Sequence, residues 1–276
     1  MSAAADTTTA GITTAGTTPT GATPDAGSDE ARLAVELHGL GLRYGDGPPV
    51  LDGLDLGIAE GEFVSILGAS GCGKSSLLNV LAGLTAPTAG WVDVPVDGAA
   101  LMFQDSALLP WLTAQQNVEL ALRLAGVPRA ERGPRARRLL DSVHLVRAHD
   151  RKPHELSGGM RQRVALARAL AQDRRLLLMD EPFAALDAIT RDLLHDELHA
   201  VWRATGATIV FVTHNVREAI RLAGRIVVLS SDPGRIAEIC TVTDALRADP
   251  AGAEALAAEL TDTLRKEQEK HDSAPR

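Results

Sequence analysis

The sequence predicts an α/β fold whose core is a parallel β-sheet covered by helices on both faces. Short runs of consecutive apolar residues, such as residues 176–179, alternate along the chain with stretches of helical periodicity. Strands that are apolar on both faces are typical of parallel sheets buried between helices. Two regions are expected to be added to this core: an antiparallel β subdomain near the start, and an inserted helical subdomain at about residues 106–156.

The elements of the core follow one another in a regular order. Residues 33–42 and 50–58 are expected to be antiparallel strands flanking a turn at residues 45–48, where Gly-Asp-Gly-Pro favours a turn. A buried strand at 62–67 precedes a glycine-rich loop. The other expected strands lie at 98–103, 176–179, 208–212 and 225–229, and the expected helices at 74–84, 115–124, 129–146, 159–171, 190–205 and 216–223.

Both ends of the chain differ in composition from the folded domain, which we place at residues 31–245. Residues 1–30 are nearly all Ala, Thr, Gly, Pro, Ser and Asp. Such a segment buries too little apolar surface to offset the entropy of ordering, so we expect a disordered tail. A regulatory or phosphorylated tail is the alternative, which nothing in the composition favours. Residues 246–276 are expected to form a C-terminal helix and a tail, because they are rich in Ala, Glu, Leu and Lys.

Composition excludes several functional classes. The net charge of -8, spread over the sequence, argues against a dedicated nucleic-acid binder, which usually carries a basic excess. Cys72 and Cys240 form no disulfide framework, which fits a reduced, cytoplasmic setting. No apolar stretch approaches the roughly 20 residues needed to span a bilayer. Any membrane role is therefore expected to be peripheral and to depend on a partner.

A phosphate-binding motif follows the strand at 62–67. This phosphate loop has the form G-x-x-x-x-G-K-[ST] and comprises Gly68, Ala69, Ser70, Gly71, Cys72, Gly73, Lys74 and Ser75. Its glycines let backbone N–H groups point inward, and the following helix N-terminus adds partial positive charge, so the loop suits a polyphosphate. Lys74 is expected to reach the β- and γ-phosphates of ATP, Ser75 to ligate Mg²⁺, and Ser76 to contact phosphate. The alternative is a glycine-rich turn with a chance lysine, which the strand–loop–helix context disfavours. Cys72 is expected to be a small filler residue rather than a redox switch.

Two carboxylates follow the apolar strand at 176–179. Asp180 and Glu181 would lie at the carboxyl end of the sheet, where α/β folds place their ligands. We expect Asp180 to hold Mg²⁺ through water and Glu181 to act as the general base for the attacking water. A helix-capping acidic pair is the plainer alternative.

A second anion-binding helix N-terminus lies in the same chain. This signature segment (residues 156–163) has the sequence Leu-Ser-Gly-Gly-Met-Arg-Gln-Arg, in which Ser157, Gly158 and Gly159 open a helix. One nucleotide has no evident need of two such cradles from one molecule. In a head-to-tail pair, the segment would instead close over the γ-phosphate held by the partner. Taken alone, the serine is equally consistent with an ordinary helix N-cap.

Together these motifs resemble the nucleotide-binding subunit of an ATP-binding-cassette (ABC) transporter, a P-loop NTPase, over residues 33–236. The resemblance implies that Tyr44 stacks on adenine and that Gln104 touches Mg²⁺ and the attacking water and relays to the membrane partner. It also implies that Asp187 bridges two subunits at the nucleotide and that His214 senses the γ-phosphate. The catalytic set is then expected to be Lys74, Gln104, Glu181 and His214.

Finer features are similar to the nitrate/sulfonate/taurine branch of ABC importers. They are the form of the signature segment and residues 108–112, 187–191 and 233–236. In this branch, the neighbourhood of Trp111 docks a short cytoplasmic helix of the permease. A buried core position is the rival interpretation of this apolar stretch, and the sequence does not separate the two. Met160, Asn215 and Gly224 depart from commoner family residues without removing a catalytic group.

The resemblance implies that the chain couples ATP hydrolysis, in a head-to-tail homodimer, to solute uptake. The implied partners are integral-membrane permease subunits and a periplasmic or lipid-anchored solute-binding protein, with the chain on the cytoplasmic face of the membrane. A soluble ABC ATPase of DNA repair or translation is the alternative, disfavoured because there is one cassette and no sustained heptad. A regulatory ATP-binding protein without a transport partner is a third. The solute is not readable from this chain.

One pair of histidines has the spacing of a metal site. His195 and His199 are four residues apart on an expected helix, but their order does not match His-Glu-x-x-His and no third ligand is evident. We expect them to lie on a solvated helix face.

Overall fold

The computed structural model describes residues 32–273. The expected tail at residues 1–30 and the last residues of the chain, 274–276, lie outside the described part. The elements are β1 Leu33–Arg43, β2 Pro49–Ala59, β3 Phe63–Gly68, α1 Lys74–Leu81, β4 Ala89–Asp93, β5 Ala99–Met102, α2 Ala114–Leu124, α3 Arg129–Ser142, the 3-10 turn η1 Pro153–Glu155, α4 Gly158–Leu170, β6 Leu176–Asp180, α5 Ala188–Thr205, β7 Thr208–Val212, α6 Val216–Leu222, β8 Arg225–Leu229, β9 Ile236–Thr241, α7 Asp244–Ala248 and α8 Pro250–Ser273. Within residues 32–273 no helix combines the length and apolar character that crossing a membrane requires.

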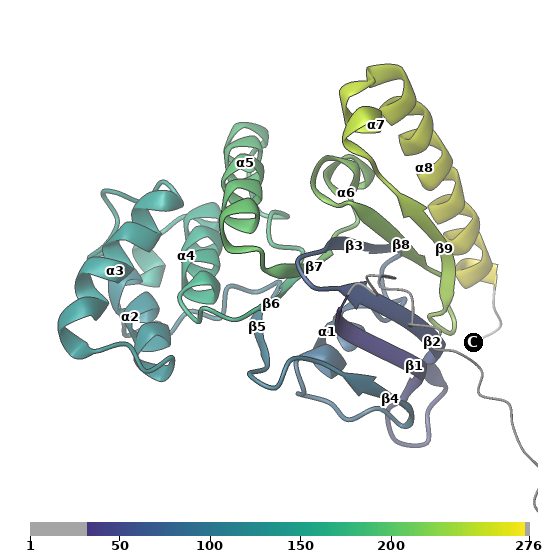
Figure 1. Cartoon of the computed structure of the whole chain (residues 1–276), viewed down its shortest axis with the longest axis horizontal. Coiled ribbons are helices and arrows are strands. Elements are labelled where there is room, and N and C mark those ends of the chain that lie inside the picture. The colour runs from purple at the N-terminus through teal and green to yellow at the C-terminus, as the bar shows by residue number, and fades with distance from the viewer. Residues whose placement is uncertain (1–31, 274–276) are drawn as a thin grey trace, which may run out of the picture. The chain divides into compact units, whose positions relative to one another are not determined.

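The central sheet has the strand order β5-β6-β7-β3-β8-β9 (Figure 1). Its first five strands pair in parallel and β9 closes the edge antiparallel to β8. Because parallel strands point the same way, the carboxyl ends of β3, β6 and β7 lie at one edge of the sheet. The predicted α/β fold is confirmed. The phosphate loop, Glu181 and His214 follow β3, β6 and β7 at that edge.

Both faces of the central sheet are buried, which explains why its strands are continuously apolar. On β6, Leu176 and Leu178 pack into a core shared with α1 and the antiparallel strands, whereas Leu177 and Met179 pack among the helices on the other face. Successive side chains of a strand point to opposite faces, so a strand covered on both sides needs apolar residues at every position.

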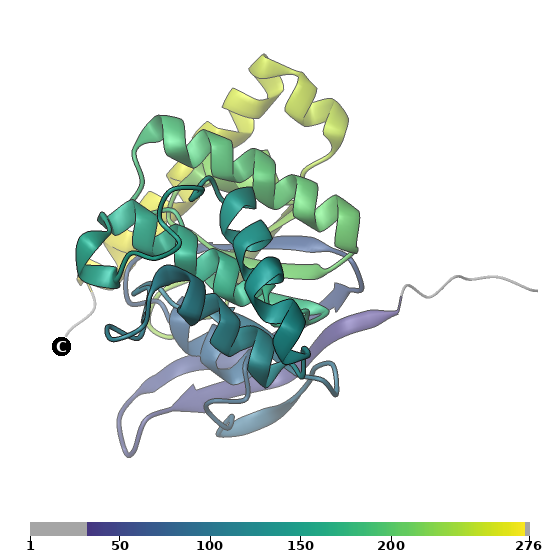
Figure 2. The same cartoon turned by 90° about the vertical axis from the view of Figure 1, so that its left-hand side faces the viewer.

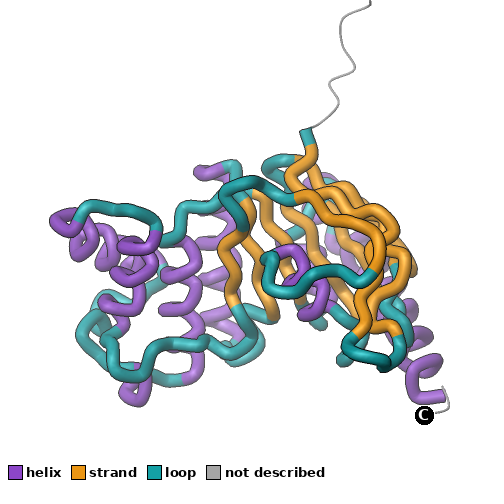
Figure 3. The backbone as a smooth tube through the Cα atoms, turned by 90° about the horizontal axis from the view of Figure 1, so that it is seen from below, coloured by secondary structure: helices purple, strands orange, loops and turns teal. Residues whose placement is uncertain are grey.

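A second sheet, of order β2-β1-β4, is antiparallel throughout. Its strands are labelled in Figure 1 and drawn in orange with those of the central sheet in Figure 3, and β1 and β2 share an apolar core with that sheet. The pairing of β1 with β2 agrees with the predicted antiparallel subdomain. Strand β4, which the sequence analysis did not anticipate, pairs with β1 through Glu36–Asp93, Leu37–Val92 and His38–Trp91.

Helices α2, α3 and α4 lie together at one end of the described region (Figure 2, front). Thr113 begins α2 with a capping box, in which its hydroxyl accepts from the Gln116 N–H. Asn117, 1% exposed, donates to the carbonyls of Leu109, Leu112 and Thr113 and accepts from the Leu109 N–H. These bonds fix the chain leading into α2, where the apolar residues 108–112 lie. The subdomain limits of about 106–156 stay a prediction.

Several helix ends differ from the expected ones. Helix α1 ends at Leu81 rather than at residue 84, and α3 ends at Ser142 rather than at 146. His144 has a φ of 58°, a left-handed conformation that an α-helix does not contain. Helix α5 begins at Ala188 because the Asp187 side chain accepts from the Thr190 N–H.

Candidate nucleotide-binding site

The phosphate loop connects the carboxyl end of β3 to the first turn of α1. Gly71 and Gly73 have φ values of 83° and 99°, conformations that side chains rarely adopt. A Cβ on Gly73 would also lie 2.6 Å from Leu51 Cδ2. The loop therefore needs glycine at Gly73 on two grounds, and its backbone can curl tightly at the helix N-terminus.

Lys74 lies inside this loop. It is 7% exposed, and its ammonium donates to the carbonyl oxygens of Gly68 at 2.8 Å and Ala69 at 2.7 Å. A buried ammonium held by two carbonyls is positioned by the loop itself rather than by an opposing carboxylate. The structure thus places the predicted phosphate-binding lysine at the helix start.

A hairpin loop from a distant part of the chain supports the phosphate loop from behind. A Cβ on Gly234 would lie 2.3 Å from the Cys72 carbonyl oxygen, so the two backbones are in close contact. The Gly234 N–H donates to the Val50 carbonyl at 2.9 Å, and its carbonyl accepts from the Asp52 N–H at 3.0 Å. Cys72 is 2% exposed; burial raises the pKa of its thiol, with Lys74 opposing the rise. These facts agree with a filler role for Cys72.

Asp180 ends β6 next to the start of α1. Burial raises the pKa of Asp180 and Glu181 adds to the rise, while a hydrogen bond from Ser75 and the charge of Lys74 oppose it. A carboxylate and a hydroxyl brought together beside a phosphate loop are hard oxygen ligands of the kind that Mg²⁺ prefers. The residues present therefore fit a magnesium ion.

Glu181 and His214 face each other across the carboxyl edge of the sheet. The Nδ1 atom of His214 lies 3.1 Å from Oε2 of Glu181. Glu181 has a φ of 44°, and its N–H donates to the Val212 carbonyl at the end of β7 at 2.9 Å. A non-glycine residue in this conformation is uncommon, and such positions cluster at functional sites. The structure brings together the predicted base and the predicted γ-phosphate sensor.

Tyr44 lies beside α1, and Gln104 follows β5 at the carboxyl edge of the sheet. The Tyr44 hydroxyl donates to Ser76 Oγ at 3.2 Å, which places the exposed ring beside α1. The Gln104 side chain is exposed, and its backbone carbonyl accepts from Gln162 Nε2 of α4 at 2.5 Å. Arg168 of α4 donates to the carbonyls of the next residues, 106 and 107. The segment after β5 is thus tied to the helical subdomain.

The first residues of the signature segment, 157–159, make their described hydrogen bonds and close contacts with α4 and with the residues before α5. Ser157 caps α4 by accepting from the Met160 N–H at 3.2 Å. A Cβ on Gly159 would lie 2.8 Å from Leu186 Cδ2, so this helix start packs against the residue before Asp187. Among residues 32–273, no described hydrogen bond joins Ser157, Gly158 or Gly159 to the phosphate loop.

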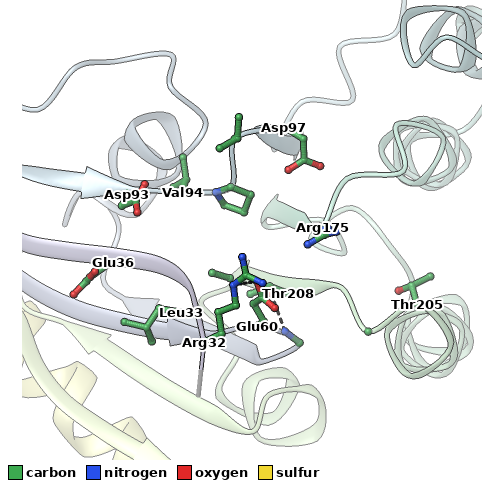
Figure 4. Close-up of a pocket in the computed structure, with 15 residues that line it drawn as sticks. Arg32, Leu33, Glu36, Glu60, Asp93, Val94, Asp97, Arg175, Thr205 and Thr208 are labelled. Atoms are coloured by element: carbon green, nitrogen blue, oxygen red, sulfur yellow. Dashed lines mark hydrogen bonds and ion pairs between the residues drawn. The ribbon is translucent and has the colours of Figure 1, made fainter. Parts of the chain in front are cut away.

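A cavity of about 880 Å³ lies elsewhere, at the amino ends of the parallel strands (Figure 4). It is lined by charged residues of both signs, including Arg32, Glu60, Asp97 and Arg175. Arg32 and Glu60 form an ion pair of 3.3 Å there. Ligands of open α/β sheets bind at the carboxyl ends of strands, so we do not assign the nucleotide to this cavity.

The fold and the loop geometry define a P-loop nucleotide-binding protein, and comparison with known proteins narrows the class. Residues 51–184 match the ABC transporter family. The chain is similar to the taurine import ATP-binding protein TauB of Pseudomonas syringae pv. tomato, at 45% identity over 74% of this chain and 81% of the relative. It is also similar to TauB of Chromobacterium violaceum, at 49% identity over 71% and 78%.

A solved structure agrees with these relatives. The chain resembles the dimeric ATP-binding cassette MJ0796 in a post-hydrolysis state bound to ADP and Pi, with a TM-score of 0.68 and 35% identity. The match covers 76% of this chain and 99% of that one. The chain belongs to the ABC transporter family and is an ATPase. Its predicted place in the nitrate/sulfonate/taurine branch is confirmed, and nothing in these relatives supports DNA repair or translation.

Sequence reasoning missed the residues directly behind the site. Glu218, 7% exposed, lies beside Thr213, Arg191 and His195. The prediction of a solvated face was wrong for His195, which is 3% exposed and packs edge-on against the Phe183 ring. The signal was present in the sequence: His195 lies next to Leu194 and three residues before Leu198, both on the buried side of α5.

Proposed function

We propose that this chain is the ATP-hydrolysing subunit of an ABC importer and that it works as a head-to-tail homodimer. One observation carries the proposal: the described part of the chain has two helix N-termini suited to anions, at Lys74 and at Ser157, and no described hydrogen bond joins them. In a dimer in which each signature segment faces the partner's phosphate loop, each nucleotide would be bound between the phosphate loop of one subunit and the signature segment of the other. The dimeric state of the similar cassette MJ0796 supports this arrangement.

The residues at the carboxyl edge suggest how ATP would be held. Lys74 and the loop N–H groups would bind the β- and γ-phosphates, and Tyr44 would stack on the adenine. Ser75, Gln104 and, through water, Asp180 would hold Mg²⁺, which when bound neutralises charge on the phosphate oxygens. The partner's copies of Ser157, Gly159 and Asp187 would contact the γ end.

Glu181 and His214 would act on the attacking water. The Glu181 carboxylate would accept the proton of that water, and His214, 3.1 Å away, would hold the carboxylate in position and contact the γ-phosphate. After hydrolysis the phosphate no longer bridges the two cradles, so the dimer would reopen. Binding energy of the γ-phosphate would thus be converted into movement between subunits.

An apolar groove beside the Gln104 segment offers a site for a permease helix. The groove has a volume of about 450 Å³ and joins the central sheet to the helical subdomain. Among the residues that line it, Leu84, Phe103 and Leu124 are 61%, 42% and 79% exposed. Trp111 is 66% exposed, which favours the docking interpretation over a buried core position. Exposed apolar clusters of this kind mark interaction surfaces.

The location and cargo follow from the same proposal. Docked to permease subunits, the chain would lie at the cytoplasmic face of the membrane, and a solute-binding protein would complete the importer. The taurine importers among its relatives suggest a small sulfonate or another small anion as cargo. We also propose that residues 31–245 form the nucleotide-binding domain and residues 246–276 an appended helix and tail.

The dimer is tested with the Glu181→Gln protein. Without a base, ATP should stay unhydrolysed and trap the closed pair, so size-exclusion chromatography with ATP and magnesium should show a dimer. Adding Ser157→Arg to this protein should return the monomer, because a long side chain would fill the cradle. A Glu181→Gln protein that stays monomeric at high concentration of ATP would contradict the proposal.

Coupling to a permease is tested by co-expression with candidate permease subunits. Wild-type protein should co-purify with the permease, and Phe103→Asp should not, since the charge would lie in the groove. Trp111→Asp tests whether the docking surface extends to residues 108–112. Retention of the Phe103→Asp protein at wild-type level would contradict docking in this groove.

A further inference from the structure

Glu218 of α6 is a buried carboxylate surrounded by three partners. Its Oε2 accepts from the Thr213 hydroxyl at 2.7 Å, and its Oε1 lies 3.4 Å from Arg191 Nε and 3.6 Å from His195 Nε2. The histidine separation is too long for a hydrogen bond, so that contact is electrostatic. Burial alone would raise the pKa of Glu218, but the facing His195, Thr213 and Arg191 outweigh burial. The pKa therefore lies below its ordinary value, and the carboxyl is ionised at neutral pH.

On one side, Glu218 and its partners contact the His214 loop (residues 213–215). The Thr213 hydroxyl that donates to Glu218 also accepts from the Asn215 N–H at 3.0 Å. The Asn215 side chain in turn caps α6 by accepting from the Arg217 N–H at 3.0 Å. The residues on both sides of His214 are therefore held by the helix that carries Glu218.

The other side reaches the Asp187 loop (residues 181–187). Arg191 donates through Nη2 to the Leu186 carbonyl at 2.9 Å, while its Nε faces Glu218. His195 packs against the ring of Phe183, with ring centroids 5.0 Å apart. The Arg191 guanidinium thus joins Glu218 to the end of this loop, and the His195 imidazole joins it to the part near the beginning.

We infer that Glu218 is a positioning residue that fixes the His214 loop and the Asp187 loop relative to each other. The inference rests on the roles proposed above for His214 and Asp187. His214 must meet the γ-phosphate in its own subunit, and Asp187 must meet the partner, so both loops must be placed together when the dimer closes. Glu218 contacts the His214 loop through the Thr213 hydroxyl and the Asp187 loop through Arg191 and His195, so a shift of either loop would disturb the contacts that hold the other.

The chain contains a matched control for this inference. Arg221, also on α6, pairs with Asp192 and with Asp196 of α5, the latter at 2.9 Å. This cluster joins the same two helices as Glu218 does, on their exposed side, and within residues 32–273 no described hydrogen bond or ion pair joins Arg221 to either loop. Asp192 also lies 3.9 Å from His195 Nδ1, so Arg221→Gln removes a link between α5 and α6 right beside His195 while every contact of Glu218 itself stays in place.

The first experiment compares the steady-state ATPase activity of full-length Glu218→Gln and Arg221→Gln. Loss of this relative placement should lower kcat of Glu218→Gln by roughly tenfold or more and leave KM for ATP within about twofold, because misplacement of catalytic groups acts on the chemical step. Thr213→Val should act in the same direction, and Thr213→Ser, which keeps the hydroxyl, should restore most of the activity. Equal losses in Glu218→Gln and Arg221→Gln, or a rise in KM that accounts for the whole effect, would overturn the inference.

The second experiment does not depend on turnover. Hydrogen–deuterium exchange of the ATP-free protein should be faster in Glu218→Gln than in wild type in peptides covering both residues 181–190 and residues 212–217. Arg221→Gln should leave both peptides unchanged. If only one of the two segments responds, Glu218 does not link them and the inference fails, whatever becomes of the proposed transport function.

Discussion

Gly234 lies against the back of the phosphate loop, where an added Cβ would come within 2.3 Å of the Cys72 carbonyl oxygen. Gly234 is held in place, since its N–H and carbonyl are hydrogen-bonded to the chain at Val50 and Asp52, so the phosphate loop is the part that must give way. Gly234→Ala should therefore displace the phosphate loop and weaken ATP binding by roughly tenfold, a loss of about 1.4 kcal/mol. Titration with a fluorescent ATP analogue measures it.

Gly224→Ala is the control for this substitution. A Cβ on Gly224 meets only the Phe63 carbonyl oxygen, at 3.9 Å, which is ordinary contact. Its affinity for ATP should match that of wild type. If Gly234→Ala binds ATP as tightly as Gly224→Ala does, the hairpin loop does not support the phosphate loop.

Most residues of the proposed nucleotide site could be predicted from the sequence because their placement is local. Residues 68–75 form one continuous loop, and Asp180 and Glu181 directly follow a strand that its apolar run identifies. Glu218 could not be predicted in this way. Its role depends on how α6 packs against α5, and no short spacing in the sequence encodes that contact.

A buried side-chain amide, that of Asn117, joins the first turns of α2 to the chain that precedes the helix. Asn117→Ala removes four hydrogen bonds and leaves partly buried backbone groups of residues 109, 112 and 113 without that partner. The free energy of unfolding should fall by about 1–3 kcal/mol, measured by urea denaturation. Arg123→Ala, an exposed position on the same helix, should change it by less than about 0.5 kcal/mol. Equal stability of the two variants would show that these bonds contribute little.

The packing of α5 on α6 should give stability a dependence on acid pH. The pKa of Glu218 is lowered from its usual value of 4.5. Its contribution is therefore present above pH 4.5 and is lost as the pH falls through the lower, folded-state value, because the unfolded chain takes up the proton first. Urea denaturation should show a shallower loss of stability below pH 4.5 in Glu218→Gln than in wild type. Parallel pH profiles would mean that this carboxyl does not titrate differently on folding.

The strands that escaped prediction, β4 and β9, are formed by pairing with another strand rather than by apolar content. Strand β4 contains Gly90 and is mostly exposed, so neither apolar content nor strand propensity distinguishes it; its place is set by pairing with β1. Strand β9 is an edge strand with half-exposed positions, formed by pairing back onto β8. The strands of the central sheet were predictable because burial on both faces makes them uniformly apolar.

For the molecule as a whole, ATP should stabilise the fold in two distinguishable ways. At an ATP concentration about 100 times Kd, binding should add roughly 2.7 kcal/mol to the free energy of unfolding of the wild type. In Glu181→Gln the gain should also rise with protein concentration, because a trapped dimer links stability to association. Differential scanning fluorimetry at several protein concentrations measures both effects.

Lys74→Ala serves as the reference for these shifts. Without the ammonium held by Gly68 and Ala69, ATP should bind weakly and the melting temperature should change little on adding ATP and magnesium. A concentration-independent shift in Glu181→Gln would indicate that nucleotide binds without bringing two molecules together.

The ammonium of Lys74, bonded to two carbonyls of its own loop, also has a practical consequence for anyone who assays this ATPase. A phosphate loop that combines backbone N–H groups at a helix N-terminus with a lysine ammonium binds small tetrahedral anions as well as nucleotide phosphates. Sulfate or phosphate in a purification buffer would therefore compete with ATP for the phosphate loop and raise the apparent Kd for ATP. Chloride-based buffers, compared side by side with sulfate at equal ionic strength, would separate that competition from ordinary charge screening.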